Sequence, residues 1–184
     1  MKRCLFSASV AVAVAIGAIG IVPHASAAAN DSTVFGMVKS AGAVPCLDPG
    51  ARGRVVISDL GQVQNMHVEV FKLPANTDFT LFVITTPKAP FVPAWYQGDL
   101  KTNASGDGVV DVTGIFSDET FIINPGPVPV EMDHLGMWFA DAADAVNAGC
   151  PGTVTPFDGD HEAGIQVLNT SNFPDGNGPL RRIQ

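Results

Sequence analysis

The sequence predicts a mainly β protein: an antiparallel β-sandwich, immunoglobulin-like or related, with one short helix and one disulfide. Three observations favour this class. Short segments rich in β-branched and aromatic residues recur along the chain, as expected of strands. Turn-forming residues separate these segments at a spacing of roughly 8–12 residues, which is typical of sandwiches. The segments do not alternate with long helices, so a parallel sheet with helical crossovers is disfavoured.

The clearest strand signal spans residues 62–73. Apolar residues occupy every second position there, and the apolar face is that of Met66, Val68 and Val70. A turn at 74–78 follows, and residues 79–85 resume as a strand that is apolar on both faces in its second half. Two strands joined by so short a turn predict a hairpin.

The remaining elements are shorter. Further strands are expected at residues 33–39, as a sheet edge, and at 54–58, 98–102, 109–116, 121–123, 135–139 and 163–168. The strands on either side of the Gly-rich turn at 103–108 predict a second hairpin. One short helix is expected from Asp141 to Ala148, because Asp is a favoured N-cap, alanines fill the interior and Gly149 follows the end.

The N-terminus has the three parts of a secretory signal peptide. Lys2 and Arg3 precede an apolar run, and Ala25-Ser26-Ala27 matches the small–x–small cleavage pattern. The run is shorter than the roughly 20 residues of a membrane-spanning helix. We therefore expect residues 1–27 to be removed, with cleavage after Ala29 as the alternative, and residues 28–184 to form a single domain. The mature protein is then secreted, extracellular or in the cell envelope, without stable membrane insertion.

Cysteine content supports the same compartment. Only Cys46 and Cys150 remain after processing, and an even pair in an exported chain predicts a disulfide. Such a bond closes a loop of about 100 residues and stabilises the fold by about 4–5 kcal/mol in the chain-entropy model. Nothing beside either cysteine forms a Cys-x-x-Cys motif, so we interpret the pair as structural.

The charge balance excludes two classes of partner. Without Lys2 and Arg3 the chain has 8 basic and 18 acidic residues, a formal charge of −10. Such a surface repels phosphate backbones and anionic lipid heads, so neither nucleic acid nor a membrane surface is expected as a partner. No Lys or Arg lies between Thr102 and Leu180, where 12 of the 18 carboxylates are found, and we interpret that stretch as a solvated acidic face.

A metal site is the main alternative to a metal-free protein. Imidazole and carboxylate groups gather in one acidic region at Asp133, His134, Asp160 and His161, with Asp158 and Glu162 beside them. These groups are ligands for zinc, copper or calcium. Their spacing matches no established metal signature. The simpler interpretation is that His134 caps a buried strand and residues 158–160 form an acidic turn.

A calcium loop is a weaker idea at residues 103–114. Oxygen donors alternate there as at the front of a helix–loop–helix calcium site, but Gly114 stands where a bidentate Glu belongs. A hairpin turn is the simpler interpretation.

Phe91, Trp95 and Tyr96 form an aromatic set within a proline-rich loop. Aromatic side chains on a stiff loop suit a recognition surface, because they offer contact area at little entropic cost. The interpretation we favour is nevertheless that they fold inward and close one end of the sandwich.

The run from His134 to Phe139 and the segment from Gly149 to Phe157 resemble a group of uncharacterised exported bacterial proteins with a single β-sandwich-like domain. His161 and the GIQVLNT segment that begins at Gly164 extend the resemblance over most of the mature chain. It implies an exported single-domain protein and brings no activity and no site residues.

These observations favour a non-catalytic binding or interaction module without a cofactor, whose ligand is a protein or a small molecule. A divalent-metal-binding protein or metalloenzyme built on His134 and His161 is the first alternative. An extracellular hydrolase is the second. No Gly-x-Ser-x-Gly elbow is present and the paired cysteines offer no thiol nucleophile, so no catalytic residue is assigned.

Overall fold

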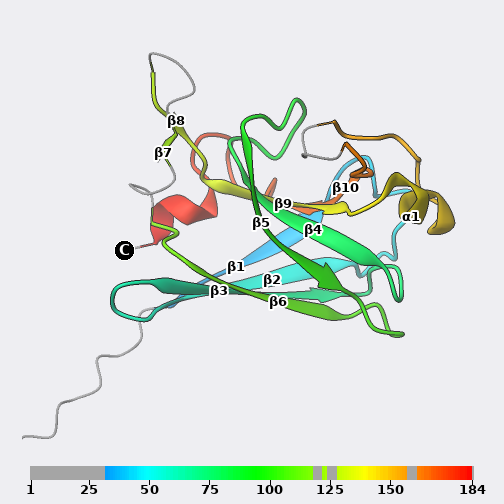
Figure 1. Cartoon of the computed structure of the whole chain (residues 1–184), viewed down its shortest axis with the longest axis horizontal. Coiled ribbons are helices and arrows are strands. Elements are labelled where there is room, and N and C mark those ends of the chain that lie inside the picture. The colour runs from blue at the N-terminus through cyan, green and yellow to red at the C-terminus, as the bar shows by residue number, and fades with distance from the viewer. Residues whose placement is uncertain (1–31, 118–121, 124–127, 157–160, 184) are drawn as a thin grey trace, which may run out of the picture.

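The computed structural model describes residues 32–117, 122–123, 128–156 and 161–183 (Figure 1). Eight antiparallel strands form one nearly closed sheet in the order β5-β4-β9-β10-β1-β2-β3-β6. The predicted mainly β, antiparallel class with one short helix and one disulfide is confirmed. In Figure 1 the sheet folds into two layers, with β4, β5, β9 and β10 facing β1, β2, β3 and β6.

The elements have the following bounds: β1 Ser32–Lys39, β2 Arg52–Asp59, β3 Gln64–Phe71, β4 Asp78–Ile84, β5 Ala94–Lys101, β6 Gly108–Gly114, β7 Ile122–Ile123, β8 Val130–Glu131, β9 His134–Phe139, α1 Ala142–Asn147, β10 Gln166–Asn169 and the 3-10 helix η1 Pro179–Arg182. Within the described residues β7 and β8 pair only with each other, as a small separate ribbon. No helix within these residues is long and apolar enough to cross a membrane.

Strand β1 joins the two layers. Its residues from Ser32 to Met37 pair with β2, whereas Val38 and Lys39 pair with β10. The prediction that this segment is an edge strand is therefore wrong. Its position at the start of the domain suggested an edge, but β2 lies on one side of it and β10 takes up its last two residues on the other.

The predicted hairpin of β3 with β4 is also wrong. β3 lies between β2 and β6, whereas β4 lies between β5 and β9 in the other layer. The turn between them carries the chain across the layers, with Lys72 and Asn76 at positive φ. The composition explains the separation: β3 has one polar face, whereas β4 ends apolar on both faces and needs cover on both sides.

β5 and β6 are joined by the expected tight turn but form no hydrogen-bonded ladder in the described part of the chain. Asn103 closes the turn by accepting hydrogen bonds from the backbone N–H groups of Ser105 and Asp107. Gly106 has a φ of +79°, and a Cβ atom there would lie 2.0 Å from the carbonyl oxygen of Leu73. The turn prediction is thus confirmed, but the chain uses it to pass between layers, so the hairpin pairing is wrong.

The core has two parts. The main part lies between the layers and receives the buried faces of β1, β2, β3, β4 and β9. A second, smaller cluster lies on the opposite face of β4 and β9 and consists of Phe82, Ile84, Trp138 and Ala163, with Phe91 and Ala94 packed against it. These two clusters cover both faces of β9, whose six residues are all buried, as the sequence predicts for this segment.

The predicted helix and disulfide are both present. The side chain of Asp141 accepts a hydrogen bond from the N–H of Ala143, and Gly149 follows the helix with a φ of +78°. Cys46 and Cys150 are bonded, with their Cα atoms 5.2 Å apart. The bond ties the end of α1 to the loop between β1 and β2.

We predict that replacing both cysteines, Cys46→Ser with Cys150→Ser, lowers the free energy of unfolding by about 2–5 kcal/mol, because the unfolded chain loses a cross-link spanning 104 residues. Guanidinium unfolding of the oxidised protein and of the double variant measures the difference. The oxidised protein treated with a reductant is the control and should match the variant. Equal midpoints before and after reduction would contradict the prediction.

Candidate functional site

A partly buried ion pair, with its carboxylate inside the protein, anchors the C-terminal segment. Asp133 is 3% exposed, and its Oδ2 accepts hydrogen bonds from Arg181 Nε at 2.8 Å and from the backbone N–H of Gly178 at 2.9 Å. The guanidinium of Arg181 also contacts the carboxylate of Glu131. This arrangement holds η1 against the start of β9, and the carboxylate of Asp133 is thereby occupied.

His134, the next residue, is fully buried. Its Nδ1 lies 2.8 Å from the hydroxyl oxygen of Thr170, and its Nε2 lies 3.2 Å from the carbonyl oxygen of Pro174. A neutral ring satisfies both contacts, with Nε2–H donating to Pro174 and Nδ1 accepting from Thr170. Burial lowers the pKa of His134, and the nearby charge of Asp133 opposes that shift. Both ring nitrogens are therefore used within the fold.

The four residues of the metal hypothesis are differently placed. Asp133 and His134 are neighbours inside the protein, whereas His161 is exposed with a φ of +60°, and Asp160 lies outside the described residues. Within residues 32–117, 122–123, 128–156 and 161–183, no group of three His, Cys, Asp or Glu side chains is arranged to hold a metal ion. The four-residue metal site remains a prediction.

His67 has carboxylate neighbours on the outer face of β3. Its Nδ1 lies 2.8 Å from Asp111 of β6, and Glu69 lies 3.9 Å from Nε2 and pairs with Arg54 at 2.9 Å. The group is partly exposed on an open sheet face, where solvent screens ion pairs and each contributes about 0–1 kcal/mol. Its arrangement is that of a surface charge network.

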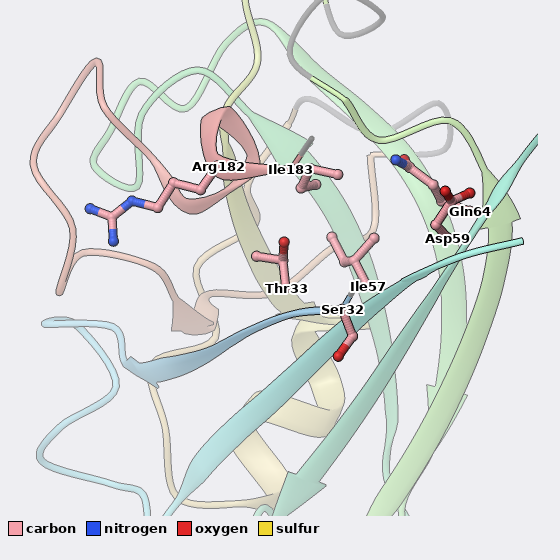
Figure 2. A pocket seen from close by; sticks show the side chains of 7 residues that line it. All are labelled: Ser32, Thr33, Ile57, Asp59, Gln64, Arg182 and Ile183. Atoms are coloured by element: carbon pink, nitrogen blue, oxygen red, sulfur yellow. The ribbon is translucent and has the colours of Figure 1, made fainter. Parts of the chain in front are cut away.

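One hollow of about 100 Å³ opens at the end of the layer formed by β1, β2 and β3 (Figure 2). It is lined by Ser32, Thr33, Ile57, Asp59, Gln64, Arg182 and Ile183. Three of its polar side chains already have partners: Gln64 Oε1 accepts from the N–H of Phe116, Asp59 accepts from the N–H of Gly61, and the Arg182 guanidinium lies over the ring of Phe173. The hollow is also smaller than the roughly 300–1,000 Å³ of typical ligand pockets.

A more open groove of about 400 Å³ lies beside the disulfide, between α1 and the loop that follows β3. Its floor includes Leu47 and Leu73, and its rim carries Asp48, Lys72 and Asp144. The rim charges of Lys72 and Asp48 lie 4.0 Å apart and are exposed, so they impose little electrostatic preference on a ligand.

The three residues of the predicted aromatic set lie in different environments. Phe91 folds inward, with its ring 5.2 Å from that of Trp138 in an edge-to-face contact. Trp95 and Tyr96, in β5, are instead 60% and 53% exposed, and Val92 beside them is 51% exposed. Inward folding is thus found for Phe91 alone. The predicted loop placement is wrong for Trp95 and Tyr96, which lie in a strand and face solvent, and a recognition role for them remains a prediction. We refer to Val92, Trp95 and Tyr96 as the aromatic edge.

Specific contacts fix the aromatic edge in position. The Tyr96 ring packs edge-on against Phe82, and its hydroxyl donates to Asp99 Oδ2 at 3.0 Å. Partial burial and the Asp99 carboxylate raise the pKa of Tyr96, so the phenol remains a donor at neutral pH. The preceding loop is held where Asn169 Nδ2 donates to the Pro87 carbonyl at 3.1 Å.

In comparisons with known proteins, no family model, no curated sequence and no solved structure matches this chain.

Sequence reasoning missed Arg181 and Val92. The signal for Arg181 was present, because it is the first basic residue after a long stretch containing 12 carboxylates and no cation. A cation that follows so long an acidic stretch is a natural partner for a buried acid. Val92 carries no signal of its own, since its exposure depends on how the proline-rich loop folds.

We predict that Asp133→Asn lowers the free energy of unfolding by about 1–3 kcal/mol, because the buried carboxylate that accepts hydrogen bonds from Arg181 and from the N–H of Gly178 is lost. Arg181 keeps its contact with Glu131, so its charge stays partnered. The matched control is Asp78→Asn, which breaks the exposed 2.7 Å pair with Lys101 and should cost about 0–1 kcal/mol. Urea unfolding of both variants gives the comparison. Equal losses would show that the buried carboxylate has no special role.

We predict a pH dependence carried by His134. Because folding lowers its pKa, its contribution to stability is present above the unfolded pKa of about 6.5 and is lost as the pH falls towards the folded pKa. Relative to His134→Gln, the wild-type protein should lose up to about 1.4 kcal/mol per pH unit within that window. Unfolding measured from neutral to mildly acidic pH tests this, since both proteins share His67 and His161. Parallel curves would contradict it.

Proposed function

We propose that this protein is a non-catalytic binding module, secreted or held at the cell surface, and that it contacts its ligand through the aromatic edge. The observation that supports this is the exposure of two adjacent large aromatic side chains, Trp95 at 60% and Tyr96 at 53%, in an otherwise acidic protein. Export is supported by the N-terminal leader pattern and by the disulfide, which persists in oxidising compartments.

Residue type favours this surface over the others. Trp and Tyr dominate the energetic centres of protein interfaces, because they bury a large area and retain a polar group. The aromatic edge also carries hydrogen-bonding groups at its margin in Gln97 and Asp99. Val92 extends the apolar area from the neighbouring loop.

Rigidity adds to the argument. Phe91 is packed on Trp138, Thr85 donates to the carbonyl of Val92 at 3.3 Å, and Lys88 pairs with Asp175 at 2.9 Å. The loop before β5 is thus fastened at several points along its length. A surface that is already ordered loses little entropy when a ligand binds, so more of the contact energy becomes affinity.

The catalytic alternatives have less support. Hydrolysis by a histidine and a carboxylate needs a pocket for the substrate, but the His67–Asp111 pair lies on an open face and lines neither described hollow. The divalent-metal alternative with His134 and His161 remains a prediction, with the two ring nitrogens of His134 engaged by Thr170 and Pro174.

We predict that the folded protein selects ligands from a random-peptide phage library or a glycan array, and that Trp95→Ala with Tyr96→Ala weakens their binding at least about tenfold, as loss of a central aromatic contact does. The control is Leu60→Ala, an equally exposed apolar residue at 57% in the turn after β2. Biolayer interferometry measures the affinities. Failure to select any ligand that depends on Trp95 and Tyr96 would overturn the proposed function.

A further inference from the structure

We propose that the first half of β5 is a docking edge that accepts an extended, positively charged segment of a partner protein as an additional strand. This inference rests on the proposed function and adds the mode of binding and the class of partner. The juxtaposition that supports it is a sheet edge at residues 94–97 that has no strand beside it in the described part of the chain, with an exposed aromatic side chain on each of its two faces. A local contact from Gln97 Nε2 to the Trp95 carbonyl, at 3.4 Å, would be exchanged for the partner strand.

The edge is open only in this half. Among the described strands, β5 stands at one end of the order and pairs with β4 alone, and β6 stands at the other end. The two strands approach each other near their shared turn, where a Cβ atom on Gly108 would lie 3.1 Å from the carbonyl oxygen of Lys101. In Figure 1 they diverge away from that turn, towards the start of β5 and the end of β6.

The register places one aromatic side chain on each side of the edge. Tyr96 is opposite Phe82, which belongs to the outer core cluster, whereas Trp95 is opposite Val83, which belongs to the main core. Successive side chains of a strand point to opposite faces, so a strand added beside Trp95 and Tyr96 would be covered on both faces. In strand addition, main-chain hydrogen bonds give affinity and alternate side-chain contacts give specificity.

Protective features limit the length of the docking edge. Exposed edges are usually shielded by proline, by bulges or by charged side chains. Pro93 precedes β5, the register shifts between Leu81 and Phe82 opposite Gln97, and Lys101 ends the strand. These features protect both ends and leave only the short aromatic portion free, which suits a short extended segment.

The charge of this protein favours a positively charged partner. Every Lys and Arg in the described residues already has an ion pair, a cation–π contact or a backbone hydrogen bond. Asp99, next to the docking edge, is exposed and has no cation among its described partners. A second copy of the chain would bring the same −10 charge, which disfavours pairing of two such edges. The complementary occupant is a strand that alternates apolar residues with Lys or Arg.

The test uses a blocked peptide of alternating lysine and valine, and two versions of it N-methylated at the odd or the even residues. Each N-methylated version removes the hydrogen-bond donors from one edge of the peptide. Binding is measured as protection of Trp95 fluorescence from quenching by acrylamide. Trp138 is fully buried, so its fluorescence serves as an internal reference. The peptide should shield Trp95, and one N-methylated version should bind at least about tenfold more weakly than the other.

Two controls separate the contributions. A peptide with glutamate in place of lysine should bind more weakly, and the difference should shrink at high salt. Leu60→Ala should bind like the wild-type protein, whereas Tyr96→Ala should lose affinity; near-ultraviolet circular dichroism, dominated by the buried Trp138, checks that both variants are folded.

The outcomes distinguish the two proposals. Equal binding of the unmodified and both N-methylated peptides would overturn strand addition, leaving side-chain contact with the aromatic edge and the proposed function intact. If the peptide does not bind, but ligands selected from the library or the glycan array still depend on Trp95, strand addition alone is overturned. Dimerisation of the chain through Trp95, seen by analytical ultracentrifugation, would replace the partner with a second copy and overturn the inference.

Discussion

The architecture depends on one strand that pairs in two directions. β1 bonds to β2 over most of its length and to β10 through its last two residues, and this is the hydrogen-bonded link between the two layers. Without that switch the eight strands would separate into two sheets of four. Because the two layers are joined at β1, β5 and β6 stand at the opposite ends of the strand order; they lie close together from their turn to Gly98 but form no ladder in the described residues. The open edge of β5 is thus a consequence of where the sheet is joined.

The second core cluster determines what that open edge presents. Burying Phe82 and Trp138 on the outer face of the β4–β9 layer requires a cover, and the proline-rich loop supplies it by inserting Phe91. A polar pair beneath the loop, Asn169 with Gln166, reinforces the cover by holding the Pro87 carbonyl. The chain then enters β5 at a fixed position, which leaves Trp95 and Tyr96 exposed at its beginning. The loop that covers Phe82 and Trp138 therefore also determines that Trp95 and Tyr96 are exposed.

Local features were predictable from the sequence, and partners distant in the chain were not. The alternation in β3, the Asp141 cap, the Asn103 turn and the Cys46–Cys150 bond each depend on a few neighbouring residues or on counting cysteines. The choice of strand neighbours depends on how the two faces of each strand are covered, which involves residues far apart in the chain. The β4 pattern, apolar on both faces, contained this information, but it could be interpreted only once the second core cluster was known. The pairing of Asp133 with Arg181 has the same character.

In the sequence, Asp133 and His134 were the leading candidates for a chemical site. The fold exposes other residues. Asp133 and His134 combine a carboxylate with an imidazole, but their polar atoms are directed to Arg181, Gly178, Thr170 and Pro174. A buried polar group without partners costs far more free energy than an exposed one, so such groups are first required to satisfy each other. Aromatic side chains differ from polar groups in this respect, because it is their exposure to water that is unfavourable. Two of them held outward on a braced edge are consequently the stronger indication of a surface that meets a partner.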